Sequence, residues 1–377
     1  MKVLQHQWKL GSQWYPALPS AGSAQIVFVF GSTALLKDKL RIEEIKKAYP
    51  DAHLFGCSTA GEILDTHVSD NTLVVTAVNF EHTRVSCVKA AIEKPTQSFE
   101  TGERLAKMLP KEGLVHAFVL SEGLNVNGSD LVKGLMSCLP KEVAVTGGLS
   151  GDGENFKETL VLADGKAEAN VVTVAGFYGD RLKIGYGSLG GWDSFGPERL
   201  ITRSSGNVLY EFDGKSALEL YKKYLGDHAK ELPAAGLLFP LSLRVHENET
   251  PVVRTILAVN EKDQSMTFAG NVPEGSMARL MKANFDRLID GAAGAAKTSS
   301  AAIGPSSAEL AILISCVGRK LILKQRVEEE VESVRDALGS RPALTGFYSY
   351  GEISPFTPGA KCELHNQTMT ITTFSEK

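Results

Sequence analysis

The sequence contains few cysteines, and no two of them stand close enough to share a role. The five cysteines among 377 residues are odd in number, widely scattered and free of any CxxC spacing. This distribution argues against a disulfide framework and against a thiolate zinc site. The HExxH and CxxCH motifs are also missing, so we predict no metal site. The cysteines are expected to be reduced thiols, most of them buried.

The chain also lacks an excess of basic residues and any long apolar run. Its formal net charge of −4 and pI of about 6.1 argue against the clustered basic face of a nucleic-acid-binding protein. No apolar run approaches the ~20 residues that span a bilayer, and the first residues lack the apolar region of a secretory signal. We therefore expect a cytoplasmic protein with no membrane span and no nucleic-acid partner.

Nucleotide-binding signatures are absent or misplaced. No GxxxxGK[ST] phosphate loop is present, which excludes a P-loop NTPase. A GxGxxG does occur at residues 185–190, but a dinucleotide fingerprint must open a helix, and this one runs into "GWDSFGPERLITRS". We expect a strand and its turn there.

The sequence does contain a glycine-rich motif that is used more than once. "FGCSTAGEI" at residues 55–63 and "GFYSYGEIS" at residues 346–354 share the pattern Gly, four residues, Gly-Glu-Ile. A related stretch runs from Gly148 to Glu154. Each copy follows a segment that reads as a buried strand, which indicates internal duplication.

The motif closes each of three predicted β-loop-α-β units. Continuous apolar strands at residues 24–30, 115–121 and 309–316 are each followed by an amphipathic helix and a second strand. The distance from the first strand to the motif, roughly 26 to 32 residues, suits a βαβ crossover. Continuous apolar strands flanked by helices are typical of parallel sheets covered on both faces. We predict an α/β fold with a mostly parallel sheet.

Between the second and third units the pattern changes to short alternating strands and turns. This predicts an inserted antiparallel β-rich section. Within it, "DGKSALELYKKYLG" predicts a helix capped by Asp213 or Ser216 and stopped by Gly226. A later helix is expected from about Ser276 to Ala296, followed by a flexible connector of small residues. We expect two domains, with these bounds: an N-terminal extension at 1–23, a first domain at 24–210 and a second domain at 211–377.

The motif turns are the candidate ligand-binding site. A glycine-rich turn at the carboxyl end of a parallel strand lies where open α/β sheets bind ligands, and glycine lets the main chain approach a bound molecule. Glu62 and Glu352 place a carboxylate at equivalent positions, suited to an ammonium group. Alternatively, each glutamate caps a backbone N–H or pairs with an arginine such as Arg319. The predicted ligand-binding residues are Gly56, Cys57, Ser58, Thr59, Gly61, Glu62, Gly148, Ser150, Asp152, Arg319, Ser349, Gly351, Glu352 and Asn366.

Catalysis and haem binding are the alternatives to a small polar ligand. The stretch at residues 56–60 fails the GxSxG pattern at its last position, so we predict no catalytic residue; a hydrolase with Ser58 or Cys57 as nucleophile stays an alternative. A non-covalent haem needs only one axial ligand in an apolar pocket, which no sequence pattern excludes. The candidates are His53, His116 and His365, for which a buried structural role is the competing interpretation.

Six separated blocks resemble the FIST family, with its N-terminal FIST_N and C-terminal FIST_C parts. The likeness runs from about residue 24 to 374. The resemblance implies an intracellular sensory protein of signal transduction, not an enzyme, that binds a small ligand such as an amino acid. The blocks are "FGCSTAGEI", "VTGGLSGDG", "LITRSSGNVLYEFDGKSALELYKKYLG", "CVGRK", "GFYSYGEISPF" and "LHNQTMT".

The resemblance also implies partners. Family members are attached to, or work beside, histidine kinases, cyclic-di-GMP enzymes or chemoreceptors. This chain has no room for such an output domain, so it is expected to signal to a separate protein. Some stand-alone members bind haem and sense nitric oxide, which keeps a haem-based nitric oxide sensor as an alternative.

Overall fold

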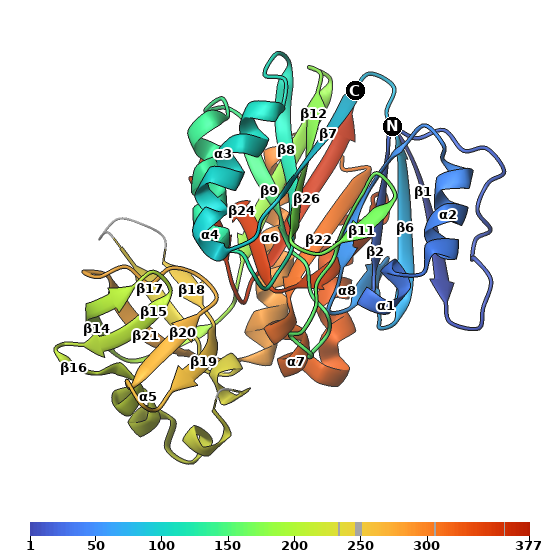
Figure 1. The fold of residues 1–377 in the computed structure, drawn as a ribbon. Helices are drawn as coiled ribbons and strands as arrows, with labels where there is room; N and C mark the ends of the chain where they lie inside the picture. Colours follow the sequence, from blue (N-terminus) through green and yellow to red (C-terminus); the bar gives the residue numbers. More distant parts are fainter. Residues whose placement is uncertain (233, 246–250, 305–306, 358) are drawn as a thin grey trace.

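The computed structural model describes residues 1–232, 234–245, 251–304, 307–357 and 359–377. These residues form three six-stranded sheets, which make up a large body, and an eight-stranded sheet in a smaller lobe beside it (Figure 1). The two ends of the chain lie close together on the large body, where the amino group of Met1 is 3.7 Å from a carboxylate oxygen of Glu376.

The first sheet contains the first β-loop-α-β unit. Its helices α1 (Thr33–Leu36) and α2 (Lys39–Ala48) connect β2 to β3. The Asp38 side chain caps α2 by accepting from the N–H groups of Leu40 and Arg41. In order across the sheet, the strands are β1 (Lys2–Lys9), β6 (Thr72–Asn79), β2 (Ile26–Gly31), β3 (His53–Ser58), β10 (Val161–Ala163) and β11 (Lys166–Glu168).

The second sheet contains the second unit. The connecting helix α4 (Gly128–Cys138) packs beside α3 (Ser98–Met108), which follows the short 3₁₀ turn η1 (Pro95–Gln97). In order, the strands are β25 (Cys362–His365), β24 (Gly351–Pro355), β9 (Ala144–Leu149), β8 (Leu114–Ser121), β12 (Val171–Tyr178) and β7 (Arg84–Ala91).

The third sheet contains the third unit. Between β22 and β23 the chain forms α7 (Val317–Leu323), the turn η4 (Lys324–Arg326) and α8 (Val327–Leu338), and α8 packs against α6 (Phe285–Ala302). In order, the strands are β13 (Leu182–Leu189), β26 (Met369–Glu376), β22 (Leu310–Cys316), β23 (Ala343–Ser349), β4 (Glu62–Leu64) and β5 (His67–Ser69).

The fourth sheet and its helix form the small lobe, inserted between β13 and α6. The predicted helix is confirmed as α5 (Ala217–Leu225): the Ser216 side chain accepts from the N–H of Glu219, and the chain leaves the helix at Gly226 with φ of 56°. The remaining elements are β14 (Asp193–Ser205), β15 (Val208–Phe212), β16 (Lys215–Ser216), η2 (Gly226–Glu231), η3 (Ala234–Leu237), β17 (Leu241–Arg244), β18 (Val252–Arg254), β19 (Ile256–Asn260), β20 (Ser265–Phe268) and β21 (Met277–Lys282).

The prediction of a mostly parallel sheet is wrong. In the described part of the chain only β2–β3, β8–β9 and β22–β23 pair in parallel, one pair in each β-loop-α-β unit. Antiparallel strands β6, β12 and β26 lie beside these pairs, so the three large sheets are mixed. The apolar pattern reports that a strand is buried on both faces, but it carries no information on the direction of the neighbouring strand.

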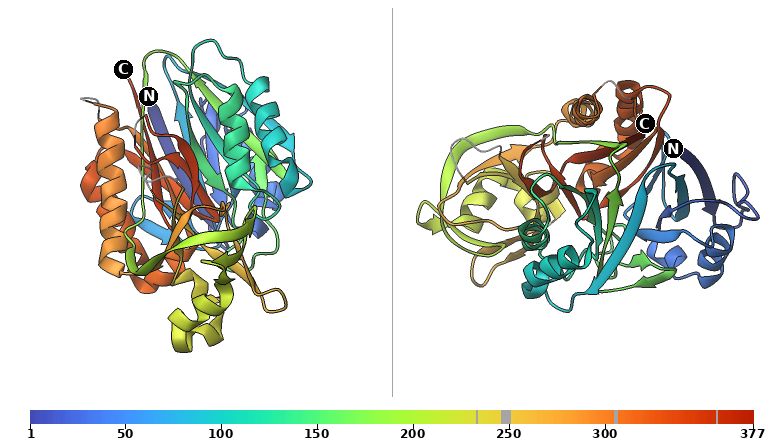
Figure 2. Two further views of the ribbon diagram at one scale, coloured as in Figure 1. Left: turned by 90° about the vertical axis from the view of Figure 1, so that its left-hand side faces the viewer. Right: turned by 90° about the horizontal axis from the view of Figure 1, so that it is seen from above.

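The layers that cover the two faces of each large sheet also differ from the prediction. Helices cover only the outer face of each large sheet, and they lie on three sides of the body when it is seen from above (Figure 2). The inner faces meet in one aromatic core, to which each sheet contributes, for example through Phe28, Phe118 and Phe347. Sheet-on-sheet packing therefore replaces the second helical layer.

The chain crosses from one sheet to another directly after each motif turn. After β3 it enters the third sheet as β4, where Glu62 pairs with Phe347 of β23. After β23 it enters the second sheet as β24, where Glu352 pairs with Gly148 of β9. After β9 it reaches the first sheet as β10, where Val161 pairs with Cys57. The repeated motif thus marks the crossing points of a cyclic exchange of strands among three sheets.

The small-residue stretch expected to be a flexible connector is helical up to Ala302, so the prediction is wrong for that part of the stretch. Its small side chains let α6 lie unusually close to β13. A Cβ atom added to Gly185 would stand 2.0 Å from the carbonyl oxygen of Ser299, and one added to Gly187 would stand 2.4 Å from that of Ala295. The strand predicted at residues 185–190 is confirmed as β13, and its glycines serve this contact.

Candidate functional site

The first glycine of the motif holds two parallel strands close together. A Cβ atom added to Gly56 would stand 1.9 Å from the carbonyl oxygen of Val29, and one added to Gly346 would stand 1.9 Å from that of Leu313. In the second unit the same contact is made by Gly147, which precedes the predicted Gly148. These glycines face the neighbouring strand, so the close approach that they permit is between two strands of the sheet.

Glu62 is bonded to its own turn and to the strand that follows. Its carboxylate accepts hydrogen bonds from the Thr59 hydroxyl, from the Thr72 N–H at 3.0 Å and from the Thr72 hydroxyl at 2.7 Å. Burial raises the pKa of this carboxyl to about 7, although the bonds from Thr59 and Thr72 oppose the rise. The side chain therefore fixes the corner between β3 and β4.

Glu352 repeats this arrangement in the third unit. It accepts from the Ser349 hydroxyl at 2.7 Å, from the Thr368 N–H at 3.2 Å and from the Thr368 hydroxyl at 3.0 Å. Burial raises its pKa to about 8, against the opposing effect of the same donors. The capping interpretation of the two glutamates therefore describes the contacts they make.

In the second unit Asp152 is the carboxylate that fixes the turn. Its carboxylate accepts from three successive backbone N–H groups, those of Phe156 and Lys157 at 2.8 Å and of Glu158 at 2.9 Å. It also accepts from the hydroxyl of Tyr350, which belongs to the motif turn of the third unit. This bond ties the second and third turns together.

The turns converge on one open cleft of about 670 Å³, here called the turn cleft. Thr59, Gly61 and Glu62 come from the first motif turn, Asp152 from the second, and Lys320 from α7 of the third unit. All three units therefore contribute to its wall, at the carboxyl ends of their parallel strands. The wall further includes Ser32, Thr33, Lys37, Asp70, Asn71, Gly153, Glu154, Asn155, Lys157, Glu158 and Val317.

The turn cleft carries charges of both signs. Lys320 pairs with Asp70 and donates to the carbonyl oxygen of Ala60 at 2.8 Å, which fixes it across the first turn. Glu154 and Lys157 are exposed in the wall and form no ion pair with any described residue. These two side chains are the charged groups left for a ligand.

Family models match most of the chain. The FIST N domain matches residues 25–215, and the FIST C domain matches residues 217–355. The chain belongs to the FIST family. FIST domains are sensory domains of signal transduction, and they are not known as catalytic domains.

An uncharacterized protein of Methanocaldococcus jannaschii is similar to this FIST protein. The two are 23% identical over 340 residues, which cover 84% of this chain and 64% of that protein. The chain thus spans less than two thirds of the length of this curated relative. Strands of the fourth sheet come from both family matches, β14 and β15 from the first and β17 to β21 from the second.

Several predicted site residues lie inside the protein, away from the turn cleft. The Ser58 hydroxyl accepts from the N–H of Leu160 at 2.8 Å, and the Ser150 hydroxyl donates to the carbonyl oxygen of Ser121 at 2.6 Å. Arg319 is fully buried and donates to the carboxylate of Glu330 at 2.6 Å. The structure does not place the following predicted residues in the cleft wall: Gly56, Cys57, Ser58, Gly148, Ser150, Arg319, Ser349, Gly351, Glu352 and Asn366.

The geometry gives no support to a nucleophile at Cys57 or Ser58. Both residues are fully buried, and burial raises the pKa of the Cys57 thiol well above its usual value, which keeps it protonated. The bond from Leu160 to the Ser58 hydroxyl holds that group in the backbone network. Neither group is positioned as an activated nucleophile.

The three candidate histidines do not fit haem. His116 lies in the aromatic core, bonded to Thr146 at 2.8 Å, and burial lowers its pKa to about 3. His365 is buried and bonded to the Ser354 carbonyl oxygen at 2.7 Å. His53, His116 and His365 are absent from the walls of the turn cleft and of the two cavities beside the small lobe.

Within the described residues, no group of three or more His, Cys, Asp or Glu side chains could hold a metal ion. Among the same residues, no helix is both long and apolar enough to cross a membrane.

Sequence reasoning missed a second cavity, of about 220 Å³, between the large body and the small lobe. Tyr350 and Phe156, whose rings stack with centroids 4.4 Å apart, line it, and Val317 lines both this cavity and the turn cleft. On the lobe side lies Thr255, whose buried hydroxyl has no partner among the described residues. The sequence signal that could have indicated this cavity is the aromatic residue Tyr350 in the motif turn.

Proposed function

We propose that this FIST protein is a cytoplasmic sensor that binds a small amino-acid-like molecule in the turn cleft and signals to a separate protein. The partner would be a histidine kinase or a cyclic-di-GMP enzyme. The observation that carries the proposal is the convergence of three duplicated units on one cleft. A ligand there would touch segments from all three large sheets at once.

The chemistry of the wall supports a zwitterionic ligand. Glu154 and Lys157 offer one free charge of each sign, while Thr59 and Asn155 add hydrogen-bonding groups. The cleft volume lies within the ~300–1,000 Å³ of small-molecule sites. An ammonium group and a carboxylate on one small molecule would pair with both charges.

The wall also supports transmission of a signal. Asp152 lines the turn cleft and accepts from Tyr350, which lines the cavity next to the small lobe. If the Asp152 loop has two arrangements that place the lobe differently, a ligand that binds one of them more tightly would favour that arrangement. The equilibrium would shift by the difference between the two binding free energies. Such couplings are typically ~1–3 kcal/mol.

Isothermal titration calorimetry with the twenty amino acids tests the proposal. We expect at least one to bind, and expect Glu154→Ala and Lys157→Ala each to weaken that binding about tenfold, because each removes one charge-assisted bond. Both side chains are exposed and outside the turn's own hydrogen bonds, so the fold should not change.

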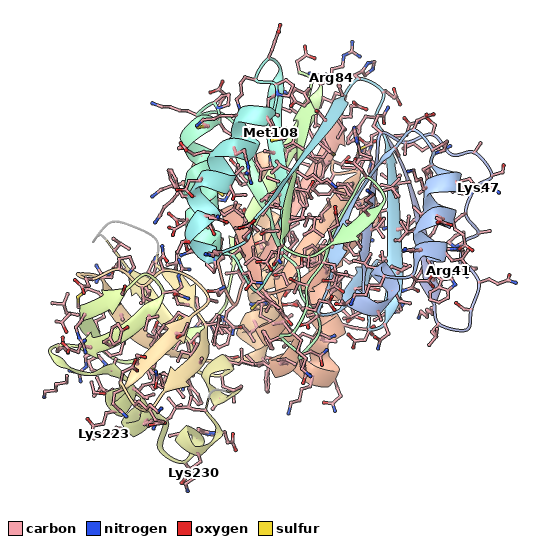
Figure 3. All side chains as sticks on the ribbon, viewed as in Figure 1. Arg41, Lys47, Arg84, Met108, Lys223 and Lys230 are labelled. Atoms are coloured by element: carbon pink, nitrogen blue, oxygen red, sulfur yellow. The ribbon has the colours of Figure 1, made fainter. Side chains whose placement is uncertain are left out.

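The matched control is Lys223→Ala, since Lys223 is an exposed lysine on the small lobe, far from the cleft (Figure 3). Its affinity should equal that of the unmodified protein. An amino acid that binds all three variants equally would place the site outside the turn cleft. If no amino acid binds, the amino-acid ligand is excluded.

A further inference from the structure

A third cavity, of about 380 Å³, lies at the seam between the small lobe and the large body, away from the turn cleft. Arg254 of β18 and Asn271 come from the lobe, whereas Ser129 of α4 and Glu363 of β25 come from the body. None of these residues lines the turn cleft. We call this cavity the seam pocket.

Arg254 is a buried cation that forms no ion pair with any carboxylate of the described residues. Its residue is 3% exposed, and its guanidinium donates only to carbonyl oxygens: Nε to Asn271 at 3.1 Å, and Nη1 to Val253 at 3.2 Å and Leu364 at 3.0 Å. Among the described residues no carboxylate lies within ion-pair distance, and Nη2 has no acceptor. Carbonyl dipoles compensate a buried guanidinium charge only in part, so direct contact with an anion would stabilise it further.

Ser129 adds a second unsatisfied group. It is 4% exposed, lines the seam pocket, and its hydroxyl has no hydrogen-bond partner in the described structure. Ser129 lies in the first turn of α4, where the helix dipole favours negative charge. The Asn127 side chain already caps this helix by accepting from the N–H of Asp130, so the Ser129 hydroxyl is not needed as a cap.

The other charges at the seam pocket are already paired, and they lie at its rim. Lys133 pairs with Asp130 at 3.3 Å, and Lys361 pairs with Glu363 at 3.4 Å. Both lysines are at least half exposed. The Glu363 carboxylate also favours the charged form of Arg254 through space, but the two form no ion pair, so Arg254 is the cation of the described wall that has no carboxylate in direct contact. Burial lowers the pKa of Arg254 to about 10, against the opposing effect of Glu363, so it stays a cation at neutral pH.

We propose that the seam pocket is a second ligand site, which binds a small molecule through an oxyanion head group, a carboxylate or a phosphate. The head group accepts from Arg254 and from the Ser129 hydroxyl at the start of α4. Arg254 belongs to the lobe and Ser129 to the body, so the bound anion joins the two parts. The pocket volume limits the ligand to a small molecule.

Inorganic phosphate and succinate are the probes, each titrated against the full chain by calorimetry, with sodium chloride of equal ionic strength as the reference. Saturable binding of either is expected, and which of the two binds more tightly identifies the head group. Arg254→Met should weaken that binding at least about tenfold, and Ser129→Ala by about fivefold. Lys223→Ala should leave it unchanged.

If Arg254→Met does not fold, Ser129→Ala decides alone, because loss of an unbonded hydroxyl does not disturb the helix. Absence of saturable binding by both anions overturns the proposal. So does equal binding by the unmodified protein and Ser129→Ala. Glu154→Ala and Lys157→Ala, which test the turn cleft, should not change anion binding, so the two sites can be told apart.

Discussion

Replacement of Glu352 by glutamine should make the protein less sensitive to alkaline pH. Folding raises the pKa of this carboxyl from 4.5 to about 8, chiefly through burial. Such a group favours the folded state most at low pH, and this advantage is lost as the pH rises from the unfolded to the folded pKa. At ~1.4 kcal/mol per pKa unit, ionised Glu352 costs roughly 5 kcal/mol of stability above pH 8. Glutamine cannot ionise, so Glu352→Gln avoids this loss.

Urea denaturation from pH 5 to pH 9 measures the effect as the difference in unfolding free energy between Glu352→Gln and the unmodified protein. The difference should shift in favour of the variant by about 1.4 kcal/mol per unit up to pH 8. His116 and His365, with pKa values lowered to about 3 and 4, titrate in both proteins and cancel. Glu62→Gln should show a smaller shift that ends near pH 7.

A constant difference between Glu352→Gln and the unmodified protein from pH 5 to pH 9 would refute this reasoning. It would mean that the buried carboxylate is fully stabilised by its Ser349 and Thr368 donors, and that burial does not control its ionisation.

Three further substitutions test the fold. Gly346→Ala should cost about 3 kcal/mol or more in a urea titration, because its Cβ would overlap the carbonyl oxygen of Leu313 on the neighbouring strand; a loss below 1 kcal/mol would contradict this contact. Arg319→Met should cost about 3–5 kcal/mol by leaving Glu330 buried and unpaired, and adding Glu330→Gln should restore part of the loss in a double-mutant cycle. Ser216→Ala should lower stability by about 1 kcal/mol through loss of the α5 cap, and an unchanged thermal melting curve would count against that cap.

The candidate site was only partly readable from the sequence. The repeated motif predicted that three turns are equivalent, and three of its polar residues, Thr59, Glu62 and Asp152, do line one cleft. The motif could not show which groups are already bonded. Glu352, which matches Glu62 in sequence and in hydrogen bonds, is buried elsewhere, because β24 crosses into the second sheet.

The charged site residues outside the motif could not be predicted from the sequence. Glu154 and Lys157 are ordinary charged residues of a loop. Arg254 is one of many arginines in the chain, and it lies in a short strand of the alternating section. Their importance arises from a cleft wall and from a buried seam, which are built by segments far apart in the chain.

By itself the sequence determined the local structure: three β-loop-α-β units, strands buried on both faces, and a helix that is capped by Ser216 and stopped by Gly226. These features depend on hydrophobic periodicity and capping, which act within one or two turns of chain. The tertiary structure alone decided which strands pair, and so made the sheets mixed and exchanged β4, β10 and β24 among them. Strand pairing uses backbone groups common to every residue, so the side-chain pattern shows that a strand is buried but not which strand lies beside it.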